Sequence, residues 1–212
     1  MNTSDKYKFI WWGTAGCGSR ATATSLTELG ADDLYNNVEK MYNNQGGSFT
    51  HHHGFPKGKE DWPVICNVRN PYSLVVSGYL DILTEYKQKG KSLDFKDYLI
   101  NHYFQEESLH REDPFFLNKW KTFHKEPEYI IHLETMDDDL RKLPFFNEDE
   151  KMNEVINEFV YHNRYKNESP YDEYEGRFQK YQLYYNQEVA DIVFDNMKEY
   201  FIKFGYDKDS WK

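Results

Sequence analysis

A glycine-rich segment near the amino terminus has the composition of an anion-binding loop. Gly13 and Gly18 have the spacing of the two glycines in the pattern G-x-x-x-x-G, and Gly16 lies between them. An apolar run at residues 8–12 precedes the segment, and the pattern after it predicts a helix over residues 21–29. Backbone amides in such a loop attract an oxyanion together with the helix amino terminus. We therefore expect an anion at this loop, with an unliganded strand-to-helix turn as the alternative.

The residues after the second glycine distinguish this loop from a nucleoside-triphosphate site. Such a site has Lys followed by Ser or Thr at these two positions, and here they are Ser19 and Arg20. The phosphate lysine and the usual magnesium hydroxyl are therefore missing. Cys17 lies near a helix amino terminus, a position that can activate a thiol, but a cysteine-phosphatase loop needs Arg where Ala23 stands. We interpret Cys17 as a small hydrophobic residue.

A second strand-to-helix turn carries an arginine and a serine at a suggestive spacing. The apolar run at residues 64–68 is followed by Arg69, Asn70 and Pro71, and Pro71 suits the first turn of a helix expected over residues 72–86. On that helix Ser73 and Ser77 share one face. An arginine at a strand end presents a planar fork of donors, and a serine hydroxyl near the helix amino terminus adds another, so the pair suits a phosphate. A surface salt bridge is the alternative role for Arg69.

The elements that position these residues alternate along the chain. A third strand is expected at residues 129–133, a short helix near 137–143, and amphipathic helices at 152–160 and 189–204, the last ended by Gly205. Less regular aromatic helices are expected around residues 95–104 and 115–123, and a tyrosine-rich loop at 161–185. Alternating strands and helices favour one three-layer α/β domain over residues 1–212, with a central parallel sheet flanked by helices. Strands 8–12 and 64–68 should be parallel neighbours whose following loops share one sheet edge.

Composition limits the ligands and the setting. The net charge of −10 argues against a nucleic-acid or anionic-membrane surface, because such surfaces need many Lys and Arg side chains. Two cysteines are too few for a disulfide framework or a zinc cluster. No signal peptide or long apolar run is evident, which predicts a soluble, cytoplasmic protein. The aromatic share of 18% implies pocket walls built from rings, which suit planar bases and sugars.

The second turn resembles the 3′-phosphate motif of sulfotransferases that use 3′-phosphoadenosine 5′-phosphosulfate (PAPS). The resemblance rests on Val68-Arg69-Asn70-Pro71 with Ser77 eight residues after the arginine. In that family the arginine and the serine bind the 3′-phosphate of the donor. The loop before it is then similar to the family's 5′-phosphosulfate loop.

Three further segments support the resemblance, which is nearest to the carbohydrate (Golgi-type) and bacterial members. Residues 18–21, Gly-Ser-Arg-Ala, are similar to the Gly-Thr-Arg-Ala of carbohydrate sulfotransferases. The stretch that begins at His132 looks like the family's third strand and its exit. The last helix, which runs into Phe204-Gly205-Tyr206, is similar to the closing helix of Golgi-type and bacterial members.

The resemblance implies a P-loop-like fold and transfer of a sulfuryl group from PAPS to a hydroxyl or amine of a carbohydrate or small-molecule acceptor. The product of the donor is 3′-phosphoadenosine 5′-phosphate (PAP), and no metal is implied. The donor-binding candidates in the two turns are Gly13, Gly16, Cys17, Gly18, Ser19, Arg20, Ala21, Arg69 and Ser77. Arg177 and Lys180 of the late loop are further candidates for the 3′-phosphate, with a solvent-facing role as the alternative.

Catalysis needs a base for the acceptor and a cation for the leaving phosphate. Three histidines lie between the first helix and the second strand, where the family's base often lies, and we favour His53 and then His51. A solvated loop or a metal site is the alternative. The family usually has Lys or Arg two residues before the second loop glycine, where Gly16 stands. Arg20 is the first candidate to replace that cation, before the two lysines at positions 57 and 59.

Two other functions compete with this prediction. A phosphotransferase using ATP and magnesium would share the architecture, but Ser19 and Arg20 disfavour it and Arg69 and Ser77 would have no special role in it. A non-catalytic module that binds PAP without turnover is favoured by Gly16. A calorimetric comparison of PAP with ATP–magnesium distinguishes the phosphotransferase from the other two functions, and a sulfate-transfer screen distinguishes the sulfotransferase from the non-catalytic module.

Overall fold

The chain folds as an α/β protein in a computed structural model that describes residues 2–14, 16–31, 33–34, 56–105, 125–146, 149–161 and 181–212. It divides into two compact units. One comprises Met1–Val68 and Lys125–Glu168, and the other Arg69–His124 and Ser169–Lys212. The expectation of one domain over residues 1–212 stays a prediction.

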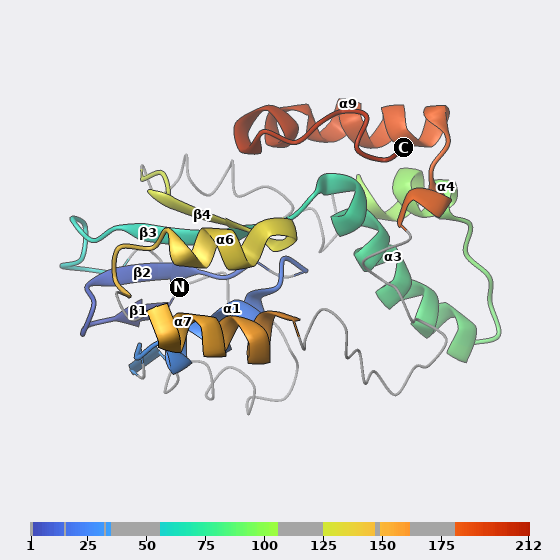
Figure 1. Cartoon of the computed structure of the whole chain (residues 1–212). Coiled ribbons are helices and arrows are strands. Elements are labelled where there is room, and N and C mark those ends of the chain that lie inside the picture. The colour runs from blue at the N-terminus through green and yellow to red at the C-terminus, as the bar shows by residue number, and fades with distance from the viewer. Residues whose placement is uncertain are drawn as a thin grey trace. The chain divides into compact units, whose positions relative to one another are not determined.

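The first unit contains a four-stranded sheet in the order β1-β2-β3-β4 (Figure 1). Strands β2 (Phe9–Trp12), β3 (Val64–Val68) and β4 (Tyr129–His132) are parallel, with Trp11 opposite Ile65 and Val68 opposite His132. The predicted parallel pairing of the first two apolar runs is therefore confirmed, and the chain leaves β2 and β3 at the same sheet edge. The sheet is mixed rather than wholly parallel, because β1 (Asn2–Ser4) pairs with β2 in the antiparallel sense.

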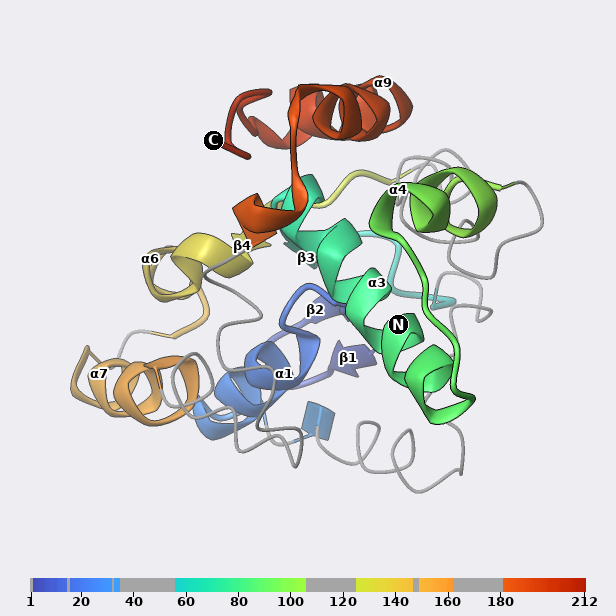
Figure 2. The ribbon, with the colours of Figure 1, turned by 90° about the vertical axis from the view of Figure 1, so that its right-hand side faces the viewer.

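One face of this sheet packs against helices of the same unit. Side chains of β2, β3 and β4, among them Trp11, Ile65 and Ile131, meet apolar residues of helices α1 (Ser19–Glu28), α6 (Met136–Arg141) and α7 (Asp149–Val155) in one core cluster. Helix α7 continues as a π-helix, Ile156–Tyr161, which packs along α1. Figure 2 shows α7 beside α1 in a second view. The helices expected at residues 21–29, 137–143 and 152–160 are therefore present, with shifted ends.

The second unit is helical and aromatic. It contains α3 (Pro71–Gln88), α4 (Phe95–Tyr98) with a π-helical continuation (Leu99–Tyr103), a 3₁₀ turn (Tyr181–Tyr184) and α9 (Gln187–Phe204). Rings hold these elements together: Tyr72 meets Phe201 of α9, and Tyr79 meets Phe95 of α4, both with centroids 5.0 Å apart. Such edge-on pairs add stability beyond the area they bury. The high aromatic content therefore builds this core.

The second unit also confirms two sequence signals at helix ends. Asn70 caps α3, since its Oδ1 accepts a hydrogen bond from the Tyr72 amide, and Pro71 occupies the first turn. At the other end of the unit, α9 stops at Gly205, whose φ of 70° is left-handed. The helix expected at residues 115–123 and most of the loop expected at 161–185 lie outside the described residues.

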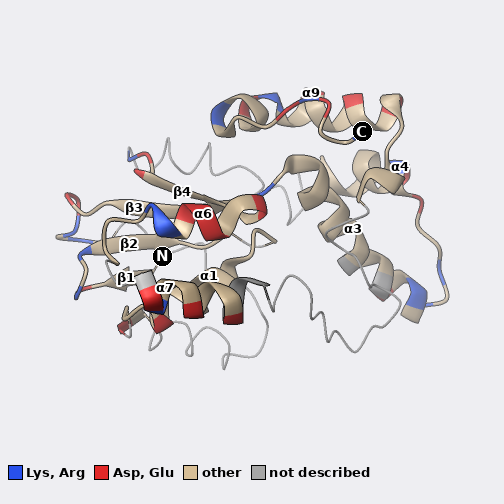
Figure 3. Cartoon of the chain, in the orientation of Figure 1, with Lys and Arg blue, Asp and Glu red and all other residues tan. Residues whose placement is uncertain are grey.

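The acidic balance of the chain is visible on the first unit. Figure 3 shows Asp and Glu along α6 and α7, and three consecutive aspartates, Asp137 to Asp139, stand in α6. The segment between β2 and α1 contains no charged residue before Arg20. That segment itself therefore offers an anion backbone amides rather than charged side chains.

Among the described helices, none combines the length and the apolar character needed to cross a membrane.

Candidate functional site

The loop between β2 and α1 delivers the chain directly into a helix with an open amino terminus. The amide of Cys17 donates to the Thr14 carbonyl over 3.2 Å, which closes a tight turn, and Gly18 is the N-cap of α1. Gly18 has no side chain to accept from the first-turn amides. The helix starts at Ser19, two residues earlier than predicted, so the amides of Ser19, Arg20 and Ala21 belong to its first turn. These are the amides that an oxyanion at a helix amino terminus engages.

Two glycines let this loop approach its neighbours closely. Gly18 has φ 73°, and a Cβ there would lie 2.5 Å from Leu133 Cδ1 and 2.9 Å from Met136 Cε. At Gly13 a Cβ would lie 2.6 Å from the Trp11 ring. The loop is therefore pressed between its own strand and the segment that links β4 to α6, and side chains at these positions would displace it.

Hydrogen bonds of Asn67 in β3 hold the glycine loop in place. Its Oδ1 accepts a hydrogen bond from Trp11 Nε1 over 2.8 Å, and its Nδ2 donates to Thr22 Oγ1 of α1 over 2.6 Å. Its backbone carbonyl accepts from Thr14 Oγ1 over 2.7 Å. Asn67 is fully buried, and Thr22 Oγ1 in turn lies 3.1 Å from the Gly18 carbonyl. One asparagine thereby ties together the strand before the loop, the loop and the helix after it.

The predicted loop residues differ in exposure. Cys17 is fully buried, which supports its interpretation as a small hydrophobic residue, and Ser19 is also buried. Gly16 is exposed, with φ 76°. Arg20 is the second residue of α1, and its side chain lies outside the described part of the chain.

In the second unit Arg69 lies just before α3, and its side chain bonds to the first turn of that helix. Its Nε donates to Ser73 Oγ over 2.8 Å, and its backbone amide donates to the Tyr200 hydroxyl over 3.2 Å. Arg69 is buried, while Ser77, one turn farther along α3, is partly exposed. The sequence placed Ser73 and Ser77 on one helix face but gave Ser73 no role. Helical spacing did not indicate this contact, because Arg69 precedes the N-cap of α3.

The carboxyl-terminal residues tie down the same turn of α3. Asn70 Nδ2 donates to Ser210 Oγ over 2.8 Å, and the Tyr72 hydroxyl donates to the Lys208 carbonyl over 2.7 Å. Burial, and then the nearby Asp191, raise the pKa of the Tyr72 hydroxyl, so it remains a donor at neutral pH. Contacts with α9 and with the carboxyl-terminal residues therefore hold the chain in place around Arg69.

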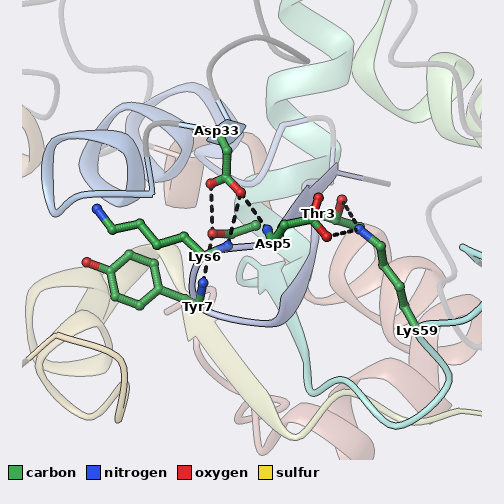
Figure 4. A network of polar contacts seen from close by, with 7 residues as sticks. Thr3, Asp5, Lys6, Tyr7, Asp33 and Lys59 are labelled. Atoms are coloured by element: carbon green, nitrogen blue, oxygen red, sulfur yellow. Dashed lines mark hydrogen bonds and ion pairs between the residues drawn. The ribbon is translucent and has the colours of Figure 1, made fainter.

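The proposed cation Lys59 is engaged elsewhere in the first unit (Figure 4). Its Nζ lies 2.7 Å from Asp5 Oδ1 and 2.9 Å from Thr3 Oγ1, and it stands 4.3 Å from the centre of the Trp62 ring. Thr3 pairs with Ile10, and Asp5 follows the residue that pairs with Phe9, so this ammonium lies beside the early part of β2 rather than at its carboxyl end. The geometry disfavours Lys59 as the cation for an anion at the loop.

A histidine and an aspartate that the sequence did not single out form a second polar centre in this unit. His132 ends β4, and its Nδ1 lies 2.9 Å from Asp139 Oδ2 in α6. Burial by itself raises the pKa of the Asp139 carboxyl, but hydrogen bonds from Lys142 and from His132 outweigh it and hold that pKa below its ordinary value. The available signal in the sequence was a histidine near the end of an expected strand, seven residues before an aspartate in an expected short helix.

Four predicted site residues, namely His51, His53, Arg177 and Lys180, lie outside the described residues. Within the described ranges no group of three His, Cys, Asp or Glu side chains could hold a metal ion.

Comparisons with known proteins gave no relative: no family model, no curated protein and no solved structure matches this chain.

Proposed function

We propose that this chain is a PAPS-dependent sulfotransferase that moves a sulfuryl group to a hydroxyl or amine of a carbohydrate or small-molecule acceptor. The observation that carries the proposal is the uncharged glycine loop after β2, which opens α1 at Gly18 with no capping side chain. Its first-turn amides suit the phosphosulfate end of the donor. The hydrogen bonds of Asn67 hold that loop in place before any ligand arrives, so little ordering is needed on binding.

The 3′-phosphate is assigned to Arg69 and Ser77. The contact of Arg69 Nε with Ser73 Oγ fixes the orientation of the guanidinium, whose planar set of donors matches the oxygens of a phosphate. Ser73 is therefore a positioning residue for Arg69 in this proposal. Arg177 and Lys180 are further candidates for the same phosphate. We also propose that the chain has a three-layer, P-loop-like fold.

The chemistry requires a cation near the departing phosphate, because negative charge grows there as the sulfur–oxygen bond breaks. Arg20 is assigned this role since it lies in the first turn of α1, directly after the loop. His53, and after it His51, are the histidines that the sequence offers as the base.

Calorimetry with three nucleotides tests the donor assignment. PAP should bind more tightly than AMP, which lacks the 3′-phosphate, and more tightly than ATP with magnesium. Arg69→Ala should weaken PAP binding by about 1.5–3 kcal/mol, or about 10- to 150-fold, and Ser77→Ala by less, with little change for AMP. Ser92→Ala, at an exposed serine of the same unit, is the matched control.

Because Arg69 is buried, Arg69→Lys and a thermal melt of each variant accompany this series. Equal losses for PAP and AMP would assign Arg69 a structural role. Tighter binding of ATP with magnesium than of PAP would reject the donor assignment.

A second candidate function is a non-catalytic PAP-binding module, which the absence of a basic residue at Gly16 favours. Transfer of ³⁵S from labelled PAPS to a panel of sugars and phenols distinguishes the two. Tight PAP binding with no labelled product from any acceptor would favour the module.

A further inference from the structure

His132 stands at the sheet edge where the glycine loop begins. It is the last residue of β4 and lies opposite Val68, the last residue of β3, in a parallel pair. The next residue, Leu133, is one of the two whose side chains press against Gly18. Ligands of open parallel sheets bind beyond the carboxyl ends of the strands. His132 therefore occupies the region of the first unit where an acceptor would meet a donor held by the loop.

Asp139 holds the imidazole of His132 in one orientation. Its Oδ2 accepts from both Nδ1 and the backbone amide of His132, each over 2.9 Å, and from Thr135 Oγ1 over 3.1 Å. Its Oδ1 accepts from Lys142 Nζ over 2.8 Å. Two donors come from the histidine itself, so the ring and its backbone are fixed together.

The pair also fixes the tautomer of the neutral ring. The hydrogen bonds that lower the pKa of Asp139 keep it ionised at neutral pH, and an ionised carboxylate only accepts. Nδ1 must then carry the proton, and Nε2 of the neutral imidazole carries the lone pair. An imidazole whose Nδ1–H is held by a carboxylate is oriented to accept a proton at Nε2.

Exposure separates this pair from an ordinary internal ion pair. The His132 side chain is 29% exposed, whereas that of Asp139 is 9% exposed. The aspartate is thus buried as a support, and the ring it supports reaches the surface of the unit.

We propose that His132 is the general base of the reaction and that Asp139 is its positioning residue, an inference that rests on the proposed sulfotransferase function. Nε2 takes the proton of the acceptor hydroxyl while the acceptor oxygen forms a bond to sulfur. The bond between sulfur and the bridging oxygen of PAPS breaks, and its electron pair stays on the phosphate of PAP. The imidazolium then releases its proton to water. His132 replaces His53 and His51 in this role.

The first test compares His132→Asn with His102→Asn. Asparagine keeps an amide donor for Asp139 but has no lone-pair nitrogen, while His102 is a partly exposed histidine of the other unit and serves as the control. With ³⁵S-labelled PAPS and chitobiose or phenol as acceptor, His132→Asn should lower kcat by about 10²- to 10⁴-fold. The Kd for PAP should stay unchanged.

Acceptor acidity provides the readout that a structural role would not give. The phenol 4-nitrophenol is far more acidic than phenol and is partly ionised near neutral pH, so it depends less on a base, and His132→Asn should lose far less activity with it than with phenol or chitobiose. An equal loss with all three acceptors, or kcat values that match those of His102→Asn, would overturn the assignment.

Nitrogen-15 NMR of the labelled histidines tests the orientation without any turnover. In the neutral form of the ring, the signal of His132 should show a protonated Nδ1 and an unprotonated Nε2, and Asp139→Asn should change this ratio. A neutral ring protonated at Nε2 in the wild type would refute the inference.

The two proposals fail in different ways. If the wild-type chain binds no PAP and transfers no label, the sulfotransferase function fails and the base fails with it. If the wild type transfers label and His132→Asn transfers it equally well, only the base is wrong.

Discussion

Replacing Asn67 by leucine should loosen the glycine loop at a cost that the structure allows us to calculate. The change keeps the branched, four-heavy-atom shape of the side chain but removes two side-chain hydrogen bonds, to Trp11 and to Thr22. Each bond contributes about 1 kcal/mol net, and a buried donor left without a partner costs about 1–3 kcal/mol more. Thr22 keeps its contact with the Gly18 carbonyl, so the penalty for a lost partner falls on Trp11 Nε1. We expect Asn67→Leu to destabilise the protein by about 3–5 kcal/mol.

Urea unfolding followed by tryptophan fluorescence measures this loss. In a chain of this size it corresponds to a fall in Tm of about 6–20 °C. Asn153→Leu is a matched control, because Asn153 is exposed and accepts a hydrogen bond from Arg141 at the surface, and it should change stability by less than about 0.5 kcal/mol. PAP binding should weaken in Asn67→Leu and not in Asn153→Leu.

A double-mutant cycle with Trp11→Phe isolates the bond between the two side chains. Phenylalanine removes the indole N–H, so the double variant has no orphaned donor and should be more stable than the sum of the single losses predicts, by about 1 kcal/mol or more. Strict additivity, or an Asn67→Leu protein as stable as the surface control, would show that Asn67 does not anchor the loop.

Three further predictions address single positions of the first unit. Gly18→Ala should destabilise the protein more than Gly58→Ala, as thermal melts of the two variants can measure. Both glycines have positive φ, so alanine costs about 1–2 kcal/mol at either position. Of these two positions, Gly18 is the one where the new Cβ would meet other side chains. The pKa of Asp139 is lowered in the folded protein, so the stability that its carboxylate contributes is complete well above the ordinary pKa of 3.8 and is lost as pH falls through the folded-state pKa. The free energy of unfolding lost in Asp139→Asn should therefore be largest near neutral pH and shrink below pH 3.8. A constant difference across that pH range would contradict this prediction. Arg20→Ala should lower turnover by roughly 10²–10³ with a much smaller change in PAP affinity, and adding Gly16→Lys should restore part of the rate; unchanged turnover in labelled-transfer assays would exclude Arg20 as the cation.

The parts of the fold that the sequence predicted are those with strong local patterns. The runs FIWW and VICNV are fully buried strands, and continuous apolar runs bounded by Gly or Pro are typical of strands in parallel sheets. The last helix was predicted from its apolar stripe and from Gly205. In the structure the apolar residues are the buried face of α9, and Gly205 is its C-cap. Pro71 marked the first turn of α3. In each case the residues that determine the element lie within it or directly beside it.

The parts that were missed depend on contacts between distant residues. Strand β1 is three residues long and polar in its sequence, so no alternation could reveal it; it exists because it pairs with the edge of β2. The start of α1 at Ser19 follows from Gly18, whose left-handed backbone admits the chain into the helix earlier than the apolar pattern indicates. Asn67 was visible as a lone polar residue inside a buried strand, and such a residue needs partners. Its partners, 45 and 56 residues away, are not visible in any local pattern.

The short segment from Asn67 to Asn70 has two anchors that act separately. The amide of Asn67 is bonded inside the first unit, where it fixes the glycine loop, and the amide of Asn70 is bonded inside the second, where it caps α3 behind Arg69. Each asparagine uses both its oxygen and its nitrogen within its own unit. A substitution at one anchor should therefore disturb the contacts of its own unit and spare those of the other. If the donor is PAPS, Asn67→Leu should weaken PAP and AMP alike, because both carry the 5′-phosphate, whereas loosening Arg69 through Asn70 should weaken PAP alone.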